Sequence, residues 1–539
     1  MVWDVVVVGG GAAALSAALA GAKEGAKVLV LAKTALGLGN SSAVSGGGFT
    51  LGVGGFPPDK HRENTLKTGR WVNDPVLVDV LVSEGPDAVL GLTEYGVKLD
   101  VGKGLASVAK YARREVIAGT AFTLPLAKAV KDRGVAVHER AMVTELLVSS
   151  GRCVGLAYLD LTSGRVEEVP ARAVVVATGG AGQLYARTDN PPGTTGDGYA
   201  LLYHAGATLK DMEFVQFFPL GFADPELPGW FIPLSLADEV PLTNDRGEEF
   251  LRKKLPEWGL STMAGAERYA RDRAAQAVAR EMAAGRTVYL HLNRLPEERW
   301  QGTLVADLKR IASKRINLRE EPVAVAPTQH FFCGGVVIGP WGETDIPGVF
   351  ACGEVAAGIH GANRVGGNAL TEAVVFGRRA GQAAARYAKE NARTPSLPVP
   401  RQTEERLKRW QEGRGTSPRE LKRRLNGVAG TYLGVLRSGK GLAAAIRELE
   451  ELAAEAREVK AEAPREIREA FEAENLILTG LMVAHSALLR EESRGTHYRE
   501  DFPAEGGPAW QCNIRIHRGE DGCPRCEKGP QACSARARM

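Results

Sequence analysis

The stretch Asp4-Val5-Val6-Val7-Val8-Gly9-Gly10-Gly11-Ala12-Ala13-Ala14 decides the fold. Its four valines, followed by glycines, predict a buried strand of the kind found in parallel sheets. The alanine-rich residues 12–24 predict a helix, and the apolar residues 27–32 predict a second strand. Together they form a βαβ unit of about 30 residues. Further predicted elements are a helix over 74–95, strands within 141–160, and a strand over 173–178.

Within this unit, the spacing Gly9-x-Gly11-x-x-Ala14 matches the dinucleotide fingerprint. Gly9 permits a tight turn, Gly11 lets backbone amides approach a pyrophosphate, and the small Ala14 lets helix and strand pack closely. The helix N-terminus then faces the phosphates with its partial positive charge. A glycine-rich turn by itself often marks only a tight loop. Because this one joins a strand to a helix, it predicts a bound dinucleotide.

The second strand ends in Ala32-Lys33, where many dinucleotide sites carry an acidic residue that binds the ribose. We therefore expect the adenosine ribose to be held in another way.

The chain has 539 residues, which is too long for one core and predicts several domains. Its net charge of +4 argues against a nucleic-acid binder with a strongly basic surface. No apolar run reaches the roughly 18 residues of a membrane-spanning helix. A strand pattern follows Met1 directly in place of a signal peptide. We therefore expect a cytoplasmic protein with no direct membrane span, peripheral to a membrane only through partners.

Changes in composition predict a discontinuous α/β domain interrupted by an insertion. The insertion is rich in aromatic residues, prolines and charged helices, and the later helical region is broken at Pro464. The expected parts are 1–210 as the first half of a Rossmann-like cofactor domain, 211–330 as an α+β capping domain, 331–392 as the second half, 400–503 as a helical domain, and 504–539 as a cysteine-rich tail without regular structure.

Four of the seven cysteines lie in the tail, as Cys512, Cys523, Cys526 and Cys533. In a reducing compartment such clustering favours a metal site over disulfides. The tail has few apolar residues, so we expect a metal to order it. Zinc and an iron–sulfur cluster are both compatible with this spacing. The alternative is a flexible tail with free thiols or an oxidisable pair.

Six further motifs occur in order along the chain. They are Ala177-Thr178-Gly179-Gly180, Thr195-Gly196-Asp197-Gly198, Glu213-Phe214-Val215-Gln216, His330 followed by Gly334-Gly335, Gly361-Ala362-Asn363-Arg364-Val365-Gly366-Gly367-Asn368-Ala369-Leu370, and Glu492-Ser493-Arg494-Gly495-Thr496-His497-Tyr498-Arg499-Glu500-Asp501-Phe502-Pro503. With these motifs the chain, up to about residue 503, resembles the flavoprotein subunits of succinate dehydrogenase and fumarate reductase, a family that includes L-aspartate oxidase.

The resemblance implies that the dinucleotide is FAD. Covalent members of the family attach FAD to a histidine just before the Gly-Gly of the flavin loop, and Asn40 stands there in this chain. Residues 34–50 contain no histidine, so we expect non-covalent FAD. The implied cofactor-binding residues are Gly9, Gly11 and Ala14 at the pyrophosphate, Lys33, Ser41, Gly46 and Gly47 along the flavin loop, and Asp197, Glu354, Asn368 and Leu370 from later segments.

In this family, hydride moves between flavin N5 and a carbon next to a carboxylate, while an arginine transfers the proton. The resemblance assigns Arg271 as the proton-transferring group, and His330 and Arg364 as substrate anchors. Arginine forks suit this task because they bind carboxylates with two parallel hydrogen bonds. The alternatives are a solvated surface position for Arg271 and a structural role for His330.

Two departures from the family pattern bear on the substrate. Phe218 replaces a second histidine, and residues 233–239 lack the expected Thr-Glu motif, with Asp238 or Glu239 as stand-ins for its proton-relaying glutamate. Each lost donor to a substrate oxygen costs about 1–3 kcal/mol. We therefore expect a small anionic substrate with one carboxylate, or another anionic end, and a less polar remainder.

The resemblance leaves two main interpretations of the function. The first is an FAD-dependent oxidoreductase acting on a C–C bond, which passes electrons to a separate iron–sulfur subunit. The second is a flavin electron-transfer subunit of a larger iron–sulfur complex, in which the substrate site has decayed. Phe218 favours the second interpretation, and the retained Arg271, His330 and Arg364 favour the first. An oxidase that releases peroxide is a third option.

Overall fold

Strands β1 (Trp3–Val8) and β2 (Val28–Ala32) pair in parallel at the centre of the main sheet. The computed structural model describes residues 1–109, 118–313, 315–392 and 396–531. Helix α1 (Ala12–Lys23) connects the two strands along the chain. The predicted βαβ unit is therefore confirmed, with bounds within a residue or two of those expected.

The main sheet has the strand order β6-β2-β1-β9-β8-β7, and β16 pairs with the C-terminal end of β9. Its remaining strands are β6 (Ala136–Glu139), β7 (Ala141–Ser149), β8 (Arg152–Asp160), β9 (Val166–Val176) and β16 (Val349–Ala351). β6, β2, β1, β9 and β16 run parallel, whereas β7 and β8 form an antiparallel extension. The carboxyl ends of β1, β9 and β16 consequently meet at one edge, where α/β folds bind ligands.

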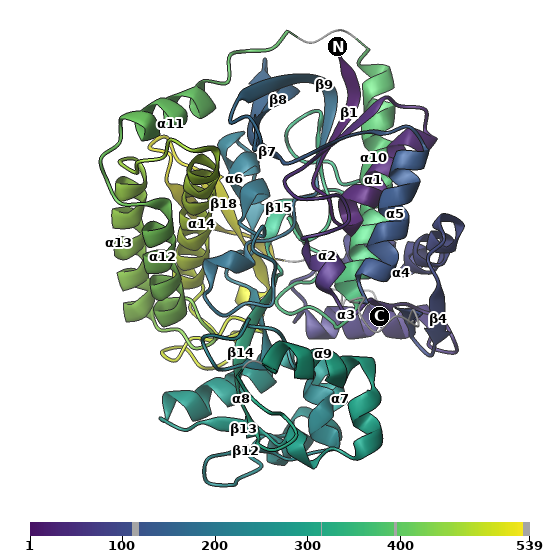
Figure 1. Ribbon diagram of the computed structural model, residues 1–539, viewed down its shortest axis with the longest axis vertical. Coiled ribbons are helices and arrows are strands. Elements are labelled where there is room, and N and C mark those ends of the chain that lie inside the picture. The colour runs from purple at the N-terminus through teal and green to yellow at the C-terminus, as the bar shows by residue number, and fades with distance from the viewer. Residues whose placement is uncertain (110–117, 314, 393–395, 532–539) are drawn as a thin grey trace.

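Helix α10 (Asn368–Glu390) crosses α1 at close range behind this sheet (Figure 1). A side chain on Gly377 would place its Cβ 2.5 Å from the carbonyl oxygen of Ala13, and one on Gly381 would place it 2.2 Å from that of Ala17. Only glycine permits this approach. The crossing brings the N-terminal end of α10 to the edge where the parallel strands end.

Smaller elements surround the first half of the chain. A three-stranded sheet contains β3 (Gly48–Thr50), β5 (Leu105–Val108) and β4 (Leu99–Gly102) in that order. The helices of this region are α2 (Ser41–Val44), α3 (Pro58–Thr68), α4 (Pro75–Leu90), α5 (Thr120–Asp132) and α6 (Asp197–His204).

A second hydrophobic core lies between residues 220 and 325, in the lobe at the bottom of Figure 1. Its four-stranded antiparallel sheet has the order β11 (Val215–Phe222), β14 (Val323–Phe332), β13 (Val288–Leu290) and β12 (Leu242–Asn244). Helices α7 (Met263–Tyr269), α8 (Arg271–Ala283) and α9 (Thr303–Ala312) belong to this lobe. Strand β10 (Leu209–Lys210) precedes β11 and β15 (Gly335–Val337) follows β14, and both belong to a separate five-stranded sheet of the main body, so the residues at the inner ends of β11 and β14 face the junction.

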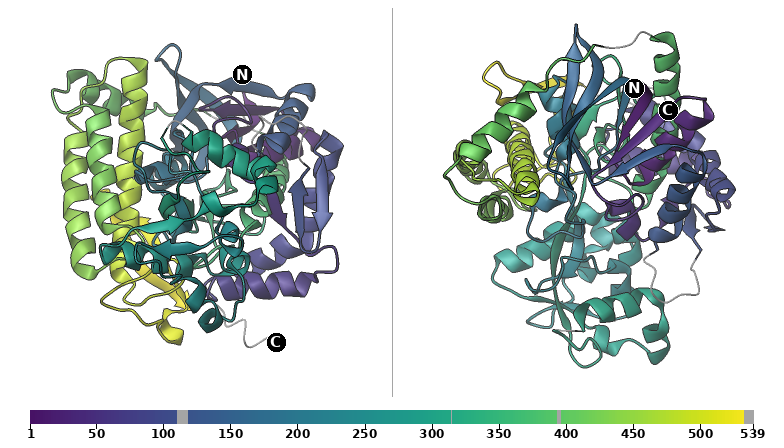
Figure 2. Two further views of the ribbon diagram at one scale, coloured as in Figure 1. Left: turned by 60° about the horizontal axis from the view of Figure 1, so that its bottom comes forward. Right: turned by 45° about the horizontal axis from the view of Figure 1, so that its top comes forward.

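The helical region packs as a layer along one side, which both views of Figure 2 show. Its helices are α11 (Arg401–Glu412), α12 (Pro418–Tyr432), α13 (Gly439–Ala456) and α14 (Pro464–Leu489). The predicted break at Pro464 is the first residue of α14, a position that proline favours because its missing N–H would have no partner there. Within the described residues, no helix has both the length and the apolarity that crossing a membrane requires.

The prediction that the tail lacks regular structure is wrong. Strands β18 (Cys512–Arg518) and β19 (Pro524–Gln531) form a hairpin, and β18 pairs with β10 (Leu209–Lys210). The hairpin completes a five-stranded sheet with β15 (Gly335–Val337) and β17 (Ala356–Ala357). Ile514 and Ile516 are fully buried and alternate with polar residues, so burial on one face orders the segment.

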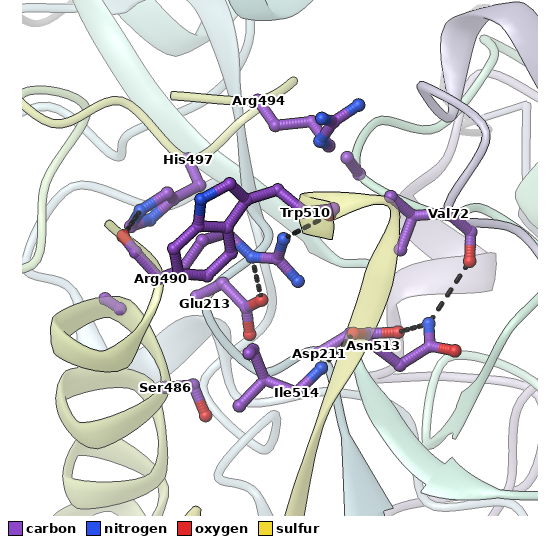
Figure 3. A network of polar contacts seen from close by, with 12 residues as sticks. Val72, Asp211, Glu213, Ser486, Arg490, Arg494, His497, Trp510, Asn513 and Ile514 are labelled. Atoms are coloured by element: carbon purple, nitrogen blue, oxygen red, sulfur yellow. Dashed lines mark hydrogen bonds and ion pairs between the residues drawn. The ribbon is translucent and has the colours of Figure 1, made fainter. Parts of the chain in front are cut away.

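Arg490, at the C-terminal end of α14, anchors the hairpin (Figure 3). Its guanidinium donates to the carboxylates of Glu213 at 2.7 Å and Glu492 at 2.9 Å. It also donates to the carbonyl oxygens of Trp510 and Cys512, at 3.1 and 2.8 Å. Arg490 is completely buried, and such a charge is tolerated only when it is paired and hydrogen-bonded.

Candidate active site

A cavity of about 520 Å³ lies where the main sheet meets β11 and β14. It brings together residues that are more than 350 positions apart in the chain. The predicted cofactor residues that line it are Gly9, Gly11, Lys33, Ser41, Gly46, Gly47, Asp197, Glu354 and Leu370. The predicted catalytic residues Arg271, His330 and Arg364 line the same cavity.

The glycine turn after β1 fits a pyrophosphate. Gly9 has φ +134°, and a Cβ there would lie 2.2 Å from the carbonyl oxygen of Ala177. Gly11 precedes α1 and makes no side-chain cap; Ala12 N donates to Ser42 Oγ at 3.2 Å, and the other amides of the first turn have no side-chain cap from Gly11 that would compete with an anion. Ala14 does not line the cavity, and its methyl group packs beneath Gly9 instead.

Lys33, at the end of β2, lies between two carboxylates. Its ammonium is 2.6 Å from Asp197 and 3.1 Å from Glu472. Burial works against the Lys33 charge, but the two carboxylates outweigh it and raise the pKa of the lysine. Lys33 therefore remains a cation at the position where many dinucleotide sites carry an acid.

Asn40 faces the cavity as the N-cap of α2. Its Oδ1 accepts a hydrogen bond from the amide of Ala43 at 3.0 Å, and its Nδ2 donates to the carbonyl oxygen of Gly10 at 3.2 Å. Capping explains why an asparagine is favourable here. A carboxamide has no nucleophilic ring nitrogen to form a bond to a flavin.

Glu354 and Asn368 have different surroundings. The Oε1 atom of Glu354 accepts from the amide of Phe332 at 3.0 Å, and burial raises the pKa of this carboxyl group to about 7. Asn368 does not line the cavity. Its Oδ1 lies 2.9 Å from His61 Nε2 and its Nδ2 donates to Thr65 Oγ1 at 3.0 Å, so it fastens the start of α10 to α3.

Arg271 is the first residue of α8 and is only 7% exposed, which excludes the solvated surface position. Its Nε donates to the carbonyl oxygen of Glu267 at 2.6 Å. The guanidinium lies 4.8 Å above the centre of the Phe218 ring. Burial lowers the pKa of Arg271, which makes its proton easier to transfer.

Arg364 enters the cavity from the loop before α10. Gln216 holds this loop by donating to the carbonyl oxygen of Arg364 at 2.9 Å. The Nε atom of Arg364 is buried without a hydrogen-bond partner among the described residues, and burial together with Arg271 lowers the pKa of Arg364 to about 9. An unpartnered buried donor in a cavity suits an anionic ligand.

His330 lies on β14 and is oriented by a carboxylate that sequence reasoning missed. Its Nδ1 is 2.6 Å from Oδ2 of Asp189. Burial lowers the pKa of His330, while Asp189 opposes this effect. With Nδ1 engaged by Asp189, Nε2 is the ring nitrogen left to contact a ligand.

Phe218 and Phe231 form an apolar wall beside these polar groups. Phe218 is 2% exposed, and its ring centre lies 5.2 Å from that of Phe231 and 5.3 Å from that of His330. Trp230 stacks on Phe231 at 5.9 Å. One side of the cavity is therefore apolar.

Neither predicted stand-in for the missing glutamate reaches the cavity. The Asp238 carboxylate accepts hydrogen bonds from the first amides of α7, and Glu239 pairs with Arg299. The carboxylate that this lobe contributes to the cavity lining is that of Glu267, whose Oε2 accepts from the amide of Ser235 at 2.9 Å. Ser235 and Arg268 also line the cavity.

The cysteines of the tail do not converge. Cys512 pairs with Gln531 at one end of the hairpin, whereas Cys523 precedes the pair Arg518–Pro524 at the other end. At about 3.3 Å per residue the hairpin separates these two cysteines by roughly 20 Å, which contradicts one metal site that uses both. Cys526 lies 3.7 Å from Ser486 Oγ, and Cys533 is outside the described residues. In the described parts of the chain, no cluster of three or more potential ligands can hold a metal ion.

Comparison with known proteins assigns the family. Residues 4–370 match the model of the FAD binding domain, and residues 422–532 match that of the fumarate reductase flavoprotein C-terminus. The chain is 34% identical to a subunit of the CoM/CoB fumarate reductase of Methanothermobacter marburgensis, covering 96% of this chain and 97% of the relative. It is also 34% identical to L-aspartate oxidase of Streptomyces coelicolor, covering 96% and 92%.

A solved structure of quinol fumarate reductase from E. coli superimposes with a TM-score of 0.89 at 26% identity, covering 99% of this chain and 97% of the other. The chain belongs to the flavoprotein family of succinate dehydrogenase and fumarate reductase. It is an FAD-dependent oxidoreductase of the kind that acts on C–C bonds.

Proposed function

We propose that this enzyme transfers hydride between non-covalently held FAD and a carbon near the carboxylate of a monocarboxylic acid. The observation that carries the proposal is the convergence of Arg271, His330 and Arg364 on one cavity beside an apolar wall. When bound, FAD supplies the acceptor or donor of hydride. The residues of the chain supply binding, orientation and the proton.

Arg364, which lines the cavity, binds the substrate carboxylate through its guanidinium group. His330, oriented by Asp189, contacts the same end of the substrate through Nε2. Both groups stabilise the charge that develops next to the carboxylate as hydride is transferred. Arg271, with its lowered pKa, exchanges a proton at the neighbouring carbon.

Phe218 and Phe231 contact the other end of the substrate and exclude water there. A second carboxylate at this end would lose its hydration without gaining a donor from Phe218. That loss costs about 1–3 kcal/mol, which disfavours fumarate relative to a 2-enoate with an apolar substituent.

The test is to reduce the flavoprotein without oxygen and mix it with fumarate and with a series of 2-enoates. We expect an apolar 2-enoate to reoxidise the flavin and Arg271→Ala to abolish this reaction. If no acceptor reoxidises the wild type and Arg271→Ala has no effect, the proposal is wrong. Denaturation should release the flavin into solution, as non-covalent binding requires.

We further propose that electrons pass between the flavin and a separate iron–sulfur subunit. The relative from M. marburgensis, which is named as a subunit, supports this view. A flavin electron-transfer role with a decayed substrate site is the alternative, and Phe218 is the observation that favours it. Activity that survives in the partner complex after Arg271→Ala would support the alternative.

A further inference from the structure

His360 and Glu372 form a buried pair outside the substrate site. Their exposed fractions are 2% and 1%, and His360 Nε2 lies 3.8 Å from Glu372 Oε2. Among the described residues, neither ring nitrogen of His360 has a hydrogen-bond partner, and the Glu372 carboxylate has the backbone of Gly353 nearby but no side-chain hydrogen bond. Buried polar groups in proteins are nearly always bonded, so a buried imidazole with two unpartnered nitrogens beside a buried carboxylate requires an explanation.

The pair lies directly behind the cavity wall. The ring of His360 meets that of Phe331 edge to face, with centres 5.2 Å apart, and Phe331 lines the cavity. Glu372 is the fifth residue of α10 and lies two residues after the cavity residue Leu370. Glu354, a cavity residue that we expect to hold FAD, is close enough to repel the charge of Glu372.

The charged and titratable groups facing the pair are Glu354, Arg364, Cys352 and Tyr199. Burial and the charge of Glu354 raise the pKa of Glu372 to about 8. Burial lowers the pKa of His360, so its ring is neutral, and burial raises the pKa values of Cys352 and Tyr199, so both keep their protons. Glu372 is thus a group whose protonation changes in mildly alkaline solution.

We propose that His360 and Glu372 form a proton-binding site that responds to the redox state of the bound flavin. Flavin reduction brings two electrons and one proton to the cofactor and leaves a net negative charge. In a poorly polarisable interior this charge favours the neutral carboxyl group, so Glu372 takes a further proton from water. The neutral imidazole of His360 accepts a hydrogen bond from the acid, and reoxidation returns the proton to water.

The direction of this proton uptake determines the pH range in which it can be measured. Well below pH 8, Glu372 is protonated whether the flavin is oxidised or reduced, and no extra proton is bound. Around and above pH 8, the oxidised protein holds a carboxylate and the reduced protein holds the acid. Proton uptake per two electrons therefore rises in the alkaline range only.

The test is the midpoint potential of the flavin, measured spectroscopically with reference dyes from pH 6 to pH 9.5, which needs no substrate. Between pH 8 and pH 9.5 we expect the potential of the wild type to fall more steeply with pH than that of Glu372→Gln. At pH 6 to 7 the two slopes should agree. Glu390→Gln, an exposed change on the same helix, should match the wild type throughout.

Parallel slopes for the wild type and Glu372→Gln across the whole range would overturn the proposal. If Glu372→Gln does not retain FAD, His360→Gln serves as the second variant. It should move the steep region to a different pH, because the acid loses its imidazole partner. An unchanged pH profile in His360→Gln would then overturn the proposal.

Discussion

His330 Nδ1 lies 2.6 Å from Asp189 Oδ2, and this contact fixes which ring nitrogen of His330 faces the cavity. The two residues are 141 positions apart in the chain and meet where β14 enters the main body. The orientation of the His330 ring therefore depends on the carboxylate of Asp189.

Replacement of Asp189 by asparagine should weaken catalysis without removing any group from the cavity lining. The loss of a charge-assisted hydrogen bond costs about 1.5–3 kcal/mol, which corresponds to a decrease of about 10- to 100-fold in kcat/KM. Anaerobic turnover of a 2-enoate measures the decrease. Asp238→Asn, which changes a carboxylate outside the cavity, serves as the control and should retain kcat/KM. Equal activity in Asp189→Asn and the wild type would show that the orientation of His330 is not limiting.

Phe218→His should shift specificity toward dicarboxylates. The imidazole restores a donor at the apolar wall, and a gain of about 1–3 kcal/mol for a second carboxylate raises the preference for fumarate at least several-fold. The measurement is the ratio of kcat/KM for fumarate to that for an apolar 2-enoate, with flavin content as the check on folding. A ratio equal to that of the wild type would mean that Phe218 does not determine the preference between the two substrates.

Gly9→Ala should yield protein that has lost FAD. The new methyl group would lie 2.2 Å from Ala177 O, and Gly9 has φ +134°, which alanine rarely adopts. The ratio of flavin absorbance to protein absorbance reports this loss. Gly25→Ala is the matched control, because Gly25 also has positive φ but no atom lies within 4 Å of its added Cβ. Full flavin content in Gly9→Ala would contradict the assigned pyrophosphate turn.

Arg490→Met should strongly destabilise the fold. It leaves the buried carboxylate of Glu213 without its ion-pair partner, which typically costs about 3–5 kcal/mol, whereas Glu492 keeps its ion pair with Arg494. Arg525→Met removes an exposed partner of Asp521 in the same hairpin and should cost at most about 1 kcal/mol. Thermal melting of both variants distinguishes them, and similar melting temperatures would show that the Arg490 network does not anchor the hairpin.

The sequence predicts the glycine turn that lines the cavity because its signal is local. Gly9 and Gly11 lie directly between a buried strand and a helix, so a short window contains the whole motif. The break at Pro464 is also predicted from a local signal, because a single proline marks it, and this residue begins α14.

The rest of the site depends on contacts between distant segments, which no window of sequence contains. Asp189 is recognised only when β14 places His330 beside it, and Glu267 only when α7 carries it to Ser235. The apolar pattern of the tail is too brief to predict a strand from sequence. Ile514 and Ile516, which alternate with polar residues, lie in a strand because this segment pairs with β10.

The most direct test of the central claim is the anaerobic reoxidation of the reduced flavin, followed by stopped-flow absorbance with equal concentrations of fumarate and of a 2-enoate bearing an apolar substituent. We predict faster reoxidation by the apolar 2-enoate, and no reoxidation by either compound in Arg271→Ala. Faster reoxidation by fumarate, or reoxidation that does not depend on Arg271, would contradict the proposed function.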